Sequence, residues 1–263
     1  MKIVTFGEVL LRLSAPGYSR LFQENKFNAT FCGGEVNVAV SVANYGADSY
    51  FITALPLNNI GKAVLNTVRS FGVDMSHCLW REGRLGLYYH ENGASQRASQ
   101  IIYDRKNSTF SQLKSGDISW EKILTKGDWL HFTGINPALG DNIVEVCIQA
   151  CEVAKKVGAI VSCDLNYRAK LWSEVKAQNI MKDIMPFIDV CIANEEDIEK
   201  TLGIKKEKTN VEKGELDVDE YLEIASEVTQ KYGCKYVAIS LRKSINANIN
   251  QWGGILYSQS DEK

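Results

Sequence analysis

The chain has 263 residues, of which 45% are apolar and 24% are charged, and its 30 basic and 32 acidic side chains give a formal net charge of -2. This composition is that of a globular protein long enough for one large α/β domain. The charge balance argues against the concentrated Lys and Arg of a nucleic-acid groove or a polybasic membrane patch, so we expect neither nucleic acid nor membrane as a partner.

The seven cysteines form no CxxC pair and no spacing suited to zinc. An odd number of cysteines fits a reducing compartment, and small buried apolar side chains explain them better than metal ligands do. The sequence shows no signal-peptide pattern and no apolar run of membrane-spanning length. We therefore expect a cytoplasmic protein.

The first half of the chain predicts strands of two kinds together with helices. Apolar and polar patterns predict strands at 3–13, 22–32, 85–90 and 100–103, and helices at 35–45 and 60–71 that end at Gly46 and Gly72. The run 3–13 is near-continuously apolar, as in a strand buried on both faces, whereas the next strands are more polar. These polar strands predict a small lid sheet, built from about 12–32 and 84–106.

The second half alternates regularly between the two kinds of element. Strands are predicted at 129–133, 159–163, 190–193 and 236–240, and helices at 142–157 (capped by Asp141), 173–185, 195–202 and 219–232. This alternation predicts a parallel sheet with helices on both faces, within a single domain over 1–263. The charged tract from Lys205 to Asp219 is expected to be a mobile surface insertion.

Two glycines and an amide separate a predicted strand from the first predicted helix. Gly33 and Gly34 would let backbone approach a ligand closely, and Asn37 offers both a hydrogen-bond donor and an acceptor. A simple tight turn explains the same residues, so both interpretations stay open.

Three polar side chains follow the predicted strand 159–163 at alternate positions. They are Asp164, Asn166 and Arg168. In doubly wound sheets, ligands bind outside the carboxyl ends of the strands, and polar groups there are costly unless they have partners. We therefore favour a functional role over the alternative, in which Asp164 only caps the next segment.

The predicted lid strands carry tyrosines and an arginine. Hydroxyls of Tyr88, Tyr89 and Tyr103 suit sugar hydroxyls, and Arg105 suits a carboxylate, which it can bind through two charge-assisted hydrogen bonds. The alternative is that the tyrosines are ordinary half-buried strand residues.

The segment from Asn194 to Asp197 opens the predicted helix 195–202 directly after a strand. Carboxylates at a helix start favour the helix dipole, which is one interpretation. The other is a role in ordering Mg²⁺ and its waters near nucleotide phosphates. No GxxxxGK[ST] loop occurs, so the chain is not a P-loop kinase.

Taken in order, these segments resemble PfkB-family (ribokinase-like) sugar kinases from Lys2 to about Tyr257. The general pattern is carried by Thr5-Phe6-Gly7-Glu8, by Gly33-Gly34 with Asn37 and Ala39, and by Gly61 before Phe71-Gly72-Val73-Asp74. More specific segments resemble 2-keto-3-deoxygluconate kinases: Gly83-Arg84-Leu85-Gly86-Leu87-Tyr88-Tyr89, Ile102-Tyr103-Asp104-Arg105, Phe132-Thr133-Gly134-Ile135, Asp164-Leu165-Asn166-Tyr167-Arg168 with Leu171-Trp172, and Ser240-Leu241-Arg242.

The resemblance implies a three-layer α/β/α fold with a mostly parallel sheet and a small β-sheet lid through which a homodimer forms. It implies phosphorylation of the sugar acid 2-keto-3-deoxygluconate at its terminal hydroxyl, with ATP and Mg²⁺ as cofactors. By position in the family motifs, the expected substrate-binding residues are Gly33, Gly34, Asn37, Tyr89, Tyr103, Arg105 and Arg168; Asn166 and Asn194 would bind the nucleotide, and Asp197 would act on the metal indirectly.

Two departures from the family pattern bear on activity. Asp197 stands where the Asn-x-x-Glu motif has Glu, and no Gly-x-Gly-Asp turn, the family's catalytic element, occurs in the sequence. We therefore name no catalytic residue and expect the chain to stop short of that turn, with an unstructured polar tail at 258–263 and an exposed apolar patch where later helices would pack.

Two alternatives to a 2-keto-3-deoxygluconate kinase stay open. One is a fragment or pseudokinase that binds a sugar acid without turning it over. The other is a kinase for fructose, ribose or a nucleoside. Arg105 and Arg168 argue against the second, because a neutral sugar gives a guanidinium no charge to pair with.

Overall fold

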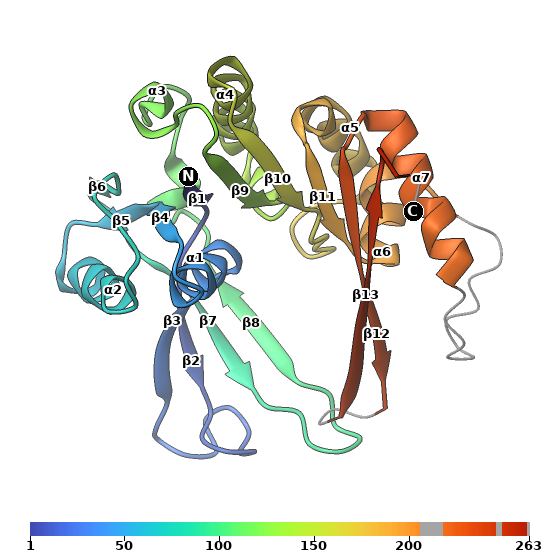
Figure 1. The fold of residues 1–263 in the computed structure, drawn as a ribbon. Coiled ribbons are helices and arrows are strands. Elements are labelled where there is room, and N and C mark those ends of the chain that lie inside the picture. Colours follow the sequence, from blue (N-terminus) through green and yellow to red (C-terminus); the bar gives the residue numbers. More distant parts are fainter. Residues whose placement is uncertain (206–217, 246–248, 262–263) are drawn as a thin grey trace. The chain divides into compact units, whose positions relative to one another are not determined.

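The computed structural model describes residues 1–205, 218–245 and 249–261 (Figure 1). Within it the chain divides into two compact units, Met1–Leu113 with Ser244–Gln251 and Lys114–Lys243 with Trp252–Lys263. The charged tract that we expect to be a surface insertion lies, over 206–217, outside the described residues.

The first unit combines two parallel strand pairs, a lid sheet and two long helices. In chain order its elements are β1 (Lys2–Phe6), β2 (Leu10–Ser14), β3 (Asn28–Cys32), α1 (Gly34–Asn44), β4 (Asp48–Ile52), β5 (Ala54–Pro56), α2 (Asn59–Arg69), β6 (Leu79–Arg81), β7 (Gly86–Glu91), β8 (Gln100–Asp104) and the 3₁₀ turn η1 (Phe110–Gln112). β1 pairs in parallel with β4, and β5 pairs in parallel with β6.

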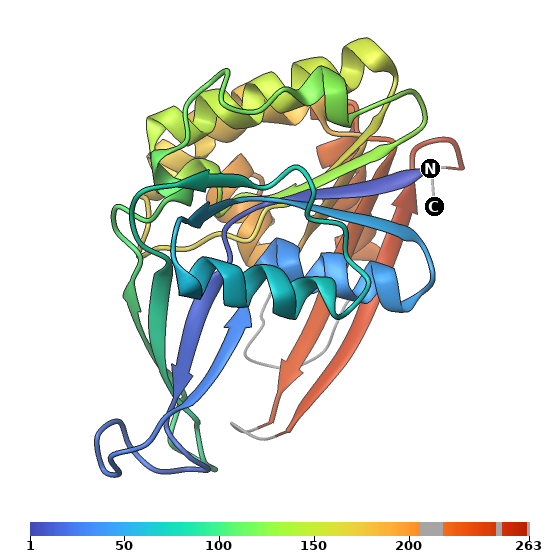
Figure 2. The ribbon, with the colours of Figure 1, turned by 90° about the vertical axis from the view of Figure 1, so that its left-hand side faces the viewer.

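The lid sheet has four strands in the order β3-β2-β7-β8. β2 pairs antiparallel with β3 and parallel with β7, and β7 pairs antiparallel with β8. Figures 1 and 2 show these strands extending together away from α1. Only 28–32 of the expected strand 22–32 is extended, because the preceding segment turns at Phe22, whose φ is 62°.

The expectation of one strand over 3–13 is wrong. The apolar run contains two strands, β1 and β2, which belong to different sheets and are separated by Gly7, Glu8 and Val9. The Gly7 N–H continues the β1 pattern by donating to the Ile52 carbonyl over 3.2 Å, after which the chain leaves for the lid. Apolar side chains on both strands hide this change of sheet from a periodicity argument.

The core of the first unit lies between its helices and strands. Buried apolar side chains of α1, α2, β4 and β5 pack together. Asn58 caps α2, since its side chain accepts the N–H groups of Ile60 and Gly61. Past the two helices, Gly46 and Gly72 have positive φ angles, as expected from the sequence.

The second unit is a parallel α/β layer, and the expected alternation of its elements is confirmed. Its elements are α3 (Trp120–Ile123), β9 (Trp129–Thr133), η2 (Pro137–Leu139), α4 (Asp141–Val157), β10 (Ile160–Asp164), α5 (Glu174–Ile184), η3 (Met185–Phe187), β11 (Val190–Ala193), α6 (Glu195–Leu202), α7 (Val218–Tyr232), β12 (Tyr236–Ser244) and β13 (Asn250–Ser258). The strands follow the order β13-β12-β11-β10-β9, with β9 to β12 parallel.

Three expectations for the second unit need correction. Asp141 lies inside the first turn of α4 rather than capping it, since Gly140 holds the cap position and no side chain bonds there. β12 runs on to Ser244, and β13 was not expected at all. The glycines at 253 and 254 weaken the strand signal of β13, and Trp252 and Leu256 on it are exposed.

None of the helices in the described ranges is both long and apolar enough to cross a membrane.

A buried histidine gives the second unit a predicted dependence on pH. His131 on β9 is 5% exposed, its Nδ1 lies 2.9 Å from the Ser162 hydroxyl oxygen, and its Nε2 has no hydrogen-bond partner within the described part of the chain. Burial lowers the pKa of His131 to about 4. Because the unfolded chain binds this proton near pH 6.5, the free energy of unfolding should fall by about 3 kcal/mol as the pH drops from above 6.5 to below 4.

Urea unfolding of the wild type and of His131→Gln between pH 7.5 and 4 measures this contribution. Asp164 acts in the opposite direction, since burial raises the pKa of its carboxyl to about 6, but it is present in both proteins and cancels in the comparison. The variant should lose less stability than the wild type on acidification. Parallel pH curves for the two proteins would contradict the assignment.

Candidate functional site

An ion pair fixes Arg105 at the end of the lid strand β8. Its Nε donates to Glu8 Oε2 over 2.8 Å, and its Nη2 donates to the same oxygen. The side chains of Arg105 and Glu8 are 11% and 2% exposed. The guanidinium also lies over the Tyr103 ring, 5.7 Å from its centroid. The structure therefore brings Tyr103 and Arg105 together, as the sequence predicts, and adds Glu8 to them.

The lid sheet separates the predicted tyrosines onto two faces. Tyr88 of β7 lies directly opposite Tyr103 of β8, with ring centroids 5.5 Å apart, and Tyr89 lies opposite Ile102. Directly opposed side chains share a face, and neighbours along a strand point to opposite faces. Tyr89 therefore does not join Tyr103 and Arg105; the tyrosine that does is Tyr88.

Tyr89 lies instead in an aromatic cluster. Its ring centroid is 6.1 Å from that of Phe22 and 6.0 Å from that of Phe27. The Tyr88 hydroxyl is 3.0 Å from Cys32 Sγ, and burial together with this contact raises the pKa of Tyr88. The register between the strands therefore shows which of the two tyrosines lies on the face of Arg105. Their adjacent positions in the sequence do not.

The diglycine segment lies at the start of α1. Gly33 precedes the helix, and a Cβ there would lie 2.3 Å from the carbonyl oxygen of Glu8, so no side chain fits. Asn37 donates its backbone N–H to the Gly33 carbonyl, and its side chain is exposed. Close packing against the Glu8 backbone thus explains why glycine is needed at position 33. This packing leaves Gly34 and Asn37 available to a ligand.

In the second unit, the loop after β10 and the start of α6 come together. Asn166 has φ 38°, a left-handed conformation that Asn tolerates better than most residues. The next N–H, that of Tyr167, donates to Asp197 Oδ1 over 2.8 Å. Asn194 caps α6, its side chain accepting the Asp197 N–H over 2.7 Å. The Asp197 carboxylate thus connects the loop after β10 to the first turn of α6.

Two carboxyl groups and one guanidinium set the charge of this region. Burial and, to a smaller extent, the nearby Asp197 carboxylate raise the pKa of Asp164 to about 6, although a backbone N–H of Asn166 and the charge of Arg168 act in the opposite direction. Burial also raises the pKa of Asp197, which Arg168 again opposes. Arg168 itself is exposed. The second unit therefore brings Asn166, Arg168, Asn194 and Asp197 into one region, whereas the sequence assigns Arg168 to the substrate and the two asparagines to the nucleotide.

These donors fit Mg²⁺ held indirectly rather than in a protein cage. Among the residues that the structure describes, no group of three or more His, Cys, Asp or Glu could hold a metal. Mg²⁺ commonly keeps several waters and binds through one or two carboxylates and substrate phosphates. The carboxylates of Asp164 and Asp197 are suited to that arrangement, since the negative charge of Asp197 raises the pKa of Asp164 and a nearby cation would oppose that effect.

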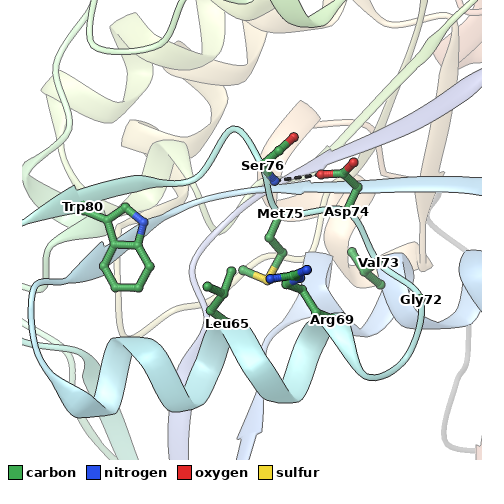
Figure 3. Close-up of a pocket in the computed structure, with 8 residues that line it drawn as sticks. All are labelled: Leu65, Arg69, Gly72, Val73, Asp74, Met75, Ser76 and Trp80. Atoms are coloured by element: carbon green, nitrogen blue, oxygen red, sulfur yellow. Dashed lines mark hydrogen bonds between the residues drawn. The ribbon is translucent and has the colours of Figure 1, made fainter.

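A pocket of about 570 Å³ lies elsewhere in the first unit, between α2 and the segment that follows it (Figure 3). Asp74 accepts the Ser76 N–H there over 2.7 Å. The pocket contains none of the residues predicted from the sequence to bind substrate. It is lined by Leu65, Arg69, Gly72, Val73, Asp74, Met75, Ser76 and Trp80.

Comparison with known proteins identifies the class. The family described as pfkB family carbohydrate kinase matches residues 1–243, and the chain belongs to it. A solved structure of 2-dehydro-3-deoxygluconokinase from Thermotoga maritima is 47% identical, superimposes with a TM-score of 0.92, and is matched over 98% of this chain and 77% of that one. This similarity confirms the expected ribokinase-like α/β fold, with its mostly parallel sheet and small lid sheet.

Curated relatives include two sugar-acid kinases. The 2-dehydro-3-deoxygalactonokinase of Haloferax volcanii is 29% identical over 98% of this chain and 76% of its own length. The 2-dehydro-3-deoxygluconokinase of Thermoproteus tenax is 26% identical over 78% of this chain and 63% of its own length. The chain thus spans between about three-fifths and three-quarters of these relatives.

Proposed function

We propose that the chain is a sugar-acid kinase for 2-keto-3-deoxygluconate, also called 2-dehydro-3-deoxygluconate, and transfers the γ-phosphoryl group of ATP to its terminal hydroxyl. The observation that carries this proposal is Arg105, a nearly buried guanidinium fixed by Glu8 and lying over the Tyr103 ring, on the face of the lid that also carries Tyr88. A sugar acid supplies the carboxylate that such a cation binds, whereas a neutral sugar does not. The names of the Thermotoga and Thermoproteus relatives support the same substrate.

A second candidate is the epimer 2-keto-3-deoxygalactonate, which the name of the Haloferax relative favours. The two acids share the carboxylate and the terminal hydroxyl and differ in the configuration of one ring or chain hydroxyl. Arg105 would therefore serve both, and the discrimination would come from polar groups such as the Tyr88 and Tyr103 hydroxyls, which hold a hydroxyl in one direction.

The residues of the two units would have different tasks. Tyr88, Tyr103 and Arg105 of the lid would orient the sugar acid, with Gly34 and Asn37 of the same unit as further contacts. Asn166 and Asn194 would bind the nucleotide phosphates, and Asp197 would order the waters of Mg²⁺. When bound, Mg²⁺ would neutralise charge on the transferring phosphoryl group. The sequence contains no Gly-x-Gly-Asp turn, so the proposal names no general base to accept the proton of the attacking hydroxyl.

The test has a binding arm and a turnover arm. Calorimetric titration of the 263-residue chain with each epimer, with fructose and ribose as neutral controls, measures recognition independently of chemistry. ADP release with MgATP and the same four sugars measures transfer. We expect a sugar acid to bind much more tightly than the neutral sugars. Sugar-acid binding without ADP release would favour the alternative of a binding fragment or pseudokinase, and tighter binding of fructose would reject the sugar-acid assignment.

Substitution of Asp197 separates its charge from its hydrogen bond. In Asp197→Asn the amide oxygen still accepts the Tyr167 N–H, but the negative charge is lost. In Asp197→Ala both are lost. If the carboxylate orders Mg²⁺, ATP binding should lose most of its Mg²⁺ dependence and weaken about tenfold in both variants, while only the alanine variant should show a lower unfolding midpoint. If the asparagine variant binds MgATP as tightly as the wild type, Asp197 has only the structural role of accepting the Tyr167 N–H.

We also propose that the protein is a cytoplasmic homodimer associated through the lid. The face that carries Tyr89 has exposed apolar side chains: Ile102 is 54% exposed and Phe22 is 71% exposed. An apolar sheet face of this kind favours association between copies. Sedimentation equilibrium of the wild type and of Ile102→Lys tests the proposal, since only the wild type should dimerise. A monomeric wild type at micromolar concentration would refute it.

A further inference from the structure

We infer that Glu8 is a positioning residue for sugar-acid recognition: it holds Arg105 so that one edge of the guanidinium is presented to the carboxylate of the ligand. The inference rests on the proposed function, because it assigns the carboxylate of the sugar acid to Arg105. It concerns only the first unit, which contains both residues.

The geometry of the ion pair divides the guanidinium into two edges. A guanidinium can take one carboxylate along its Nε–Nη edge and another along its Nη–Nη edge. Glu8 occupies the first edge of Arg105, since Nε and Nη2 both donate to Oε2. The second edge, Nη1 with Nη2, keeps the planar fork that binds a second carboxylate through two hydrogen bonds.

Glu8 is itself held in place from several sides. The Ser108 hydroxyl donates to Glu8 Oε1, and Ser108 is 1% exposed. A Cβ on Gly86 would lie 2.8 Å from Glu8 Oε1 and 3.1 Å from Arg105 Cβ, so the glycine leaves the space that the pair fills. The Glu8 carboxylate is therefore held in one orientation. Because Arg105 is hydrogen-bonded to it, the guanidinium is also held in one orientation.

A fixed guanidinium lowers the cost of binding. An arginine side chain loses rotamer entropy when it is ordered. The pair with Glu8 and the contact with the Tyr103 ring order Arg105 before a ligand arrives. This effect opposes the negative charge of Glu8, which repels an anionic ligand, so the two possible roles of Glu8 predict opposite results when its charge is removed.

The experiment compares Glu8→Gln with the wild type in calorimetric titrations with two ligands. One ligand is 2-keto-3-deoxygluconate, and the other is the same sugar with its carboxylate reduced to a primary alcohol. Positioning predicts that the variant binds the acid about tenfold more weakly than the wild type and binds the alcohol with unchanged affinity. A general structural defect would weaken both ligands alike. Unchanged or tighter binding of the acid by Glu8→Gln would overturn the inference.

Glu91→Gln is the matched control. Glu91 is another buried lid carboxylate, 5% exposed and paired with Arg97 over 2.8 Å, but it lies outside the predicted site. The Glu91→Gln variant should therefore bind the sugar acid with the same affinity as the wild type. If Glu8→Gln does not fold, Ser108→Ala loosens the same carboxylate, and it should weaken acid binding less but in the same direction. A wild type that binds neither ligand would refute the proposed function and with it the inference, whereas an acid-binding wild type with an unaffected Ser108→Ala would overturn the inference alone.

Discussion

Arg105→Met should abolish measurable binding of the sugar acid and also destabilise the first unit by about 3–5 kcal/mol. The loss of binding follows from the loss of the cation that pairs with the carboxylate. The loss of stability follows because the buried Glu8 side chain, 2% exposed, loses its cation and keeps only the Ser108 hydroxyl as a partner. Both effects are larger than those expected for any other single substitution in the lid.

A double variant separates the two effects. Glu8→Gln with Arg105→Met removes the charges together, so most of the lost stability should return, while the sugar acid should still fail to bind. Urea unfolding and calorimetric titration of the wild type, the single variant and the double variant measure this. Recovery of binding in the double variant would show that Arg105 is not the carboxylate ligand.

Arg84→Met is the control for removing a lid arginine. Arg84 pairs with Asp104 over 2.6 Å, but the two side chains are 40% and 51% exposed. Water screens such a pair, so the urea midpoint should hardly change. A loss of stability as large as that of Arg105→Met would mean that burial is not what makes the Glu8 pair important.

Gly134→Ala should destabilise the second unit by about 3 kcal/mol and weaken nucleotide binding. Gly134 follows β9, and its N–H donates to the Asp164 carbonyl over 2.8 Å. A Cβ there would lie 2.2 Å from the carbonyl oxygen of Leu165, which is backbone and cannot rotate away. The methyl group must therefore displace the chain between Asp164 and Arg168, where the predicted ligand residues lie.

Gly253→Ala is the matched control, because the nearest side-chain atoms to its Cβ, those of Leu241, are 3.8 Å away. This is an ordinary van der Waals contact, and a β-strand favours alanine over glycine. Urea unfolding and fluorescent-nucleotide titration of the two variants measure the difference. Equal stability of Gly134→Ala and Gly253→Ala would show that the backbone after β9 and the backbone after β10 can move apart to accommodate a methyl group.

Local patterns predicted most of the second unit, apart from β13, because most of its longer elements carry their own signal. The helix α6 has the predicted bounds, 195–202, and both of its ends depend on local features: the capping side chain of Asn194 and the left-handed Gly203. The strand β11 likewise has the predicted bounds, 190–193. The alternation of such elements is enough to give a parallel sheet.

The candidate site was predictable in type but not in detail. The sequence names Tyr103, Arg105 and Asp197 through polar residues placed after strands, but it gives no sign that Glu8 pairs with Arg105, because 97 positions separate the two. It also cannot choose between Tyr88 and Tyr89, since that choice depends on the register between β7 and β8. Long-range pairing and register are properties of the folded chain, and local patterns do not encode them.

The two faces of the lid sheet have a consequence for how such a protein can diversify. Neighbouring residues on β8, Ile102 and Tyr103, point to opposite sides, so residues of the two faces are interleaved in sequence while physically separate. Point substitutions can therefore alter one face and leave the other intact. A single-residue insertion within β7 or β8 would exchange the faces and damage both at once, so we expect natural length variation in this region to be confined to the loop between these strands.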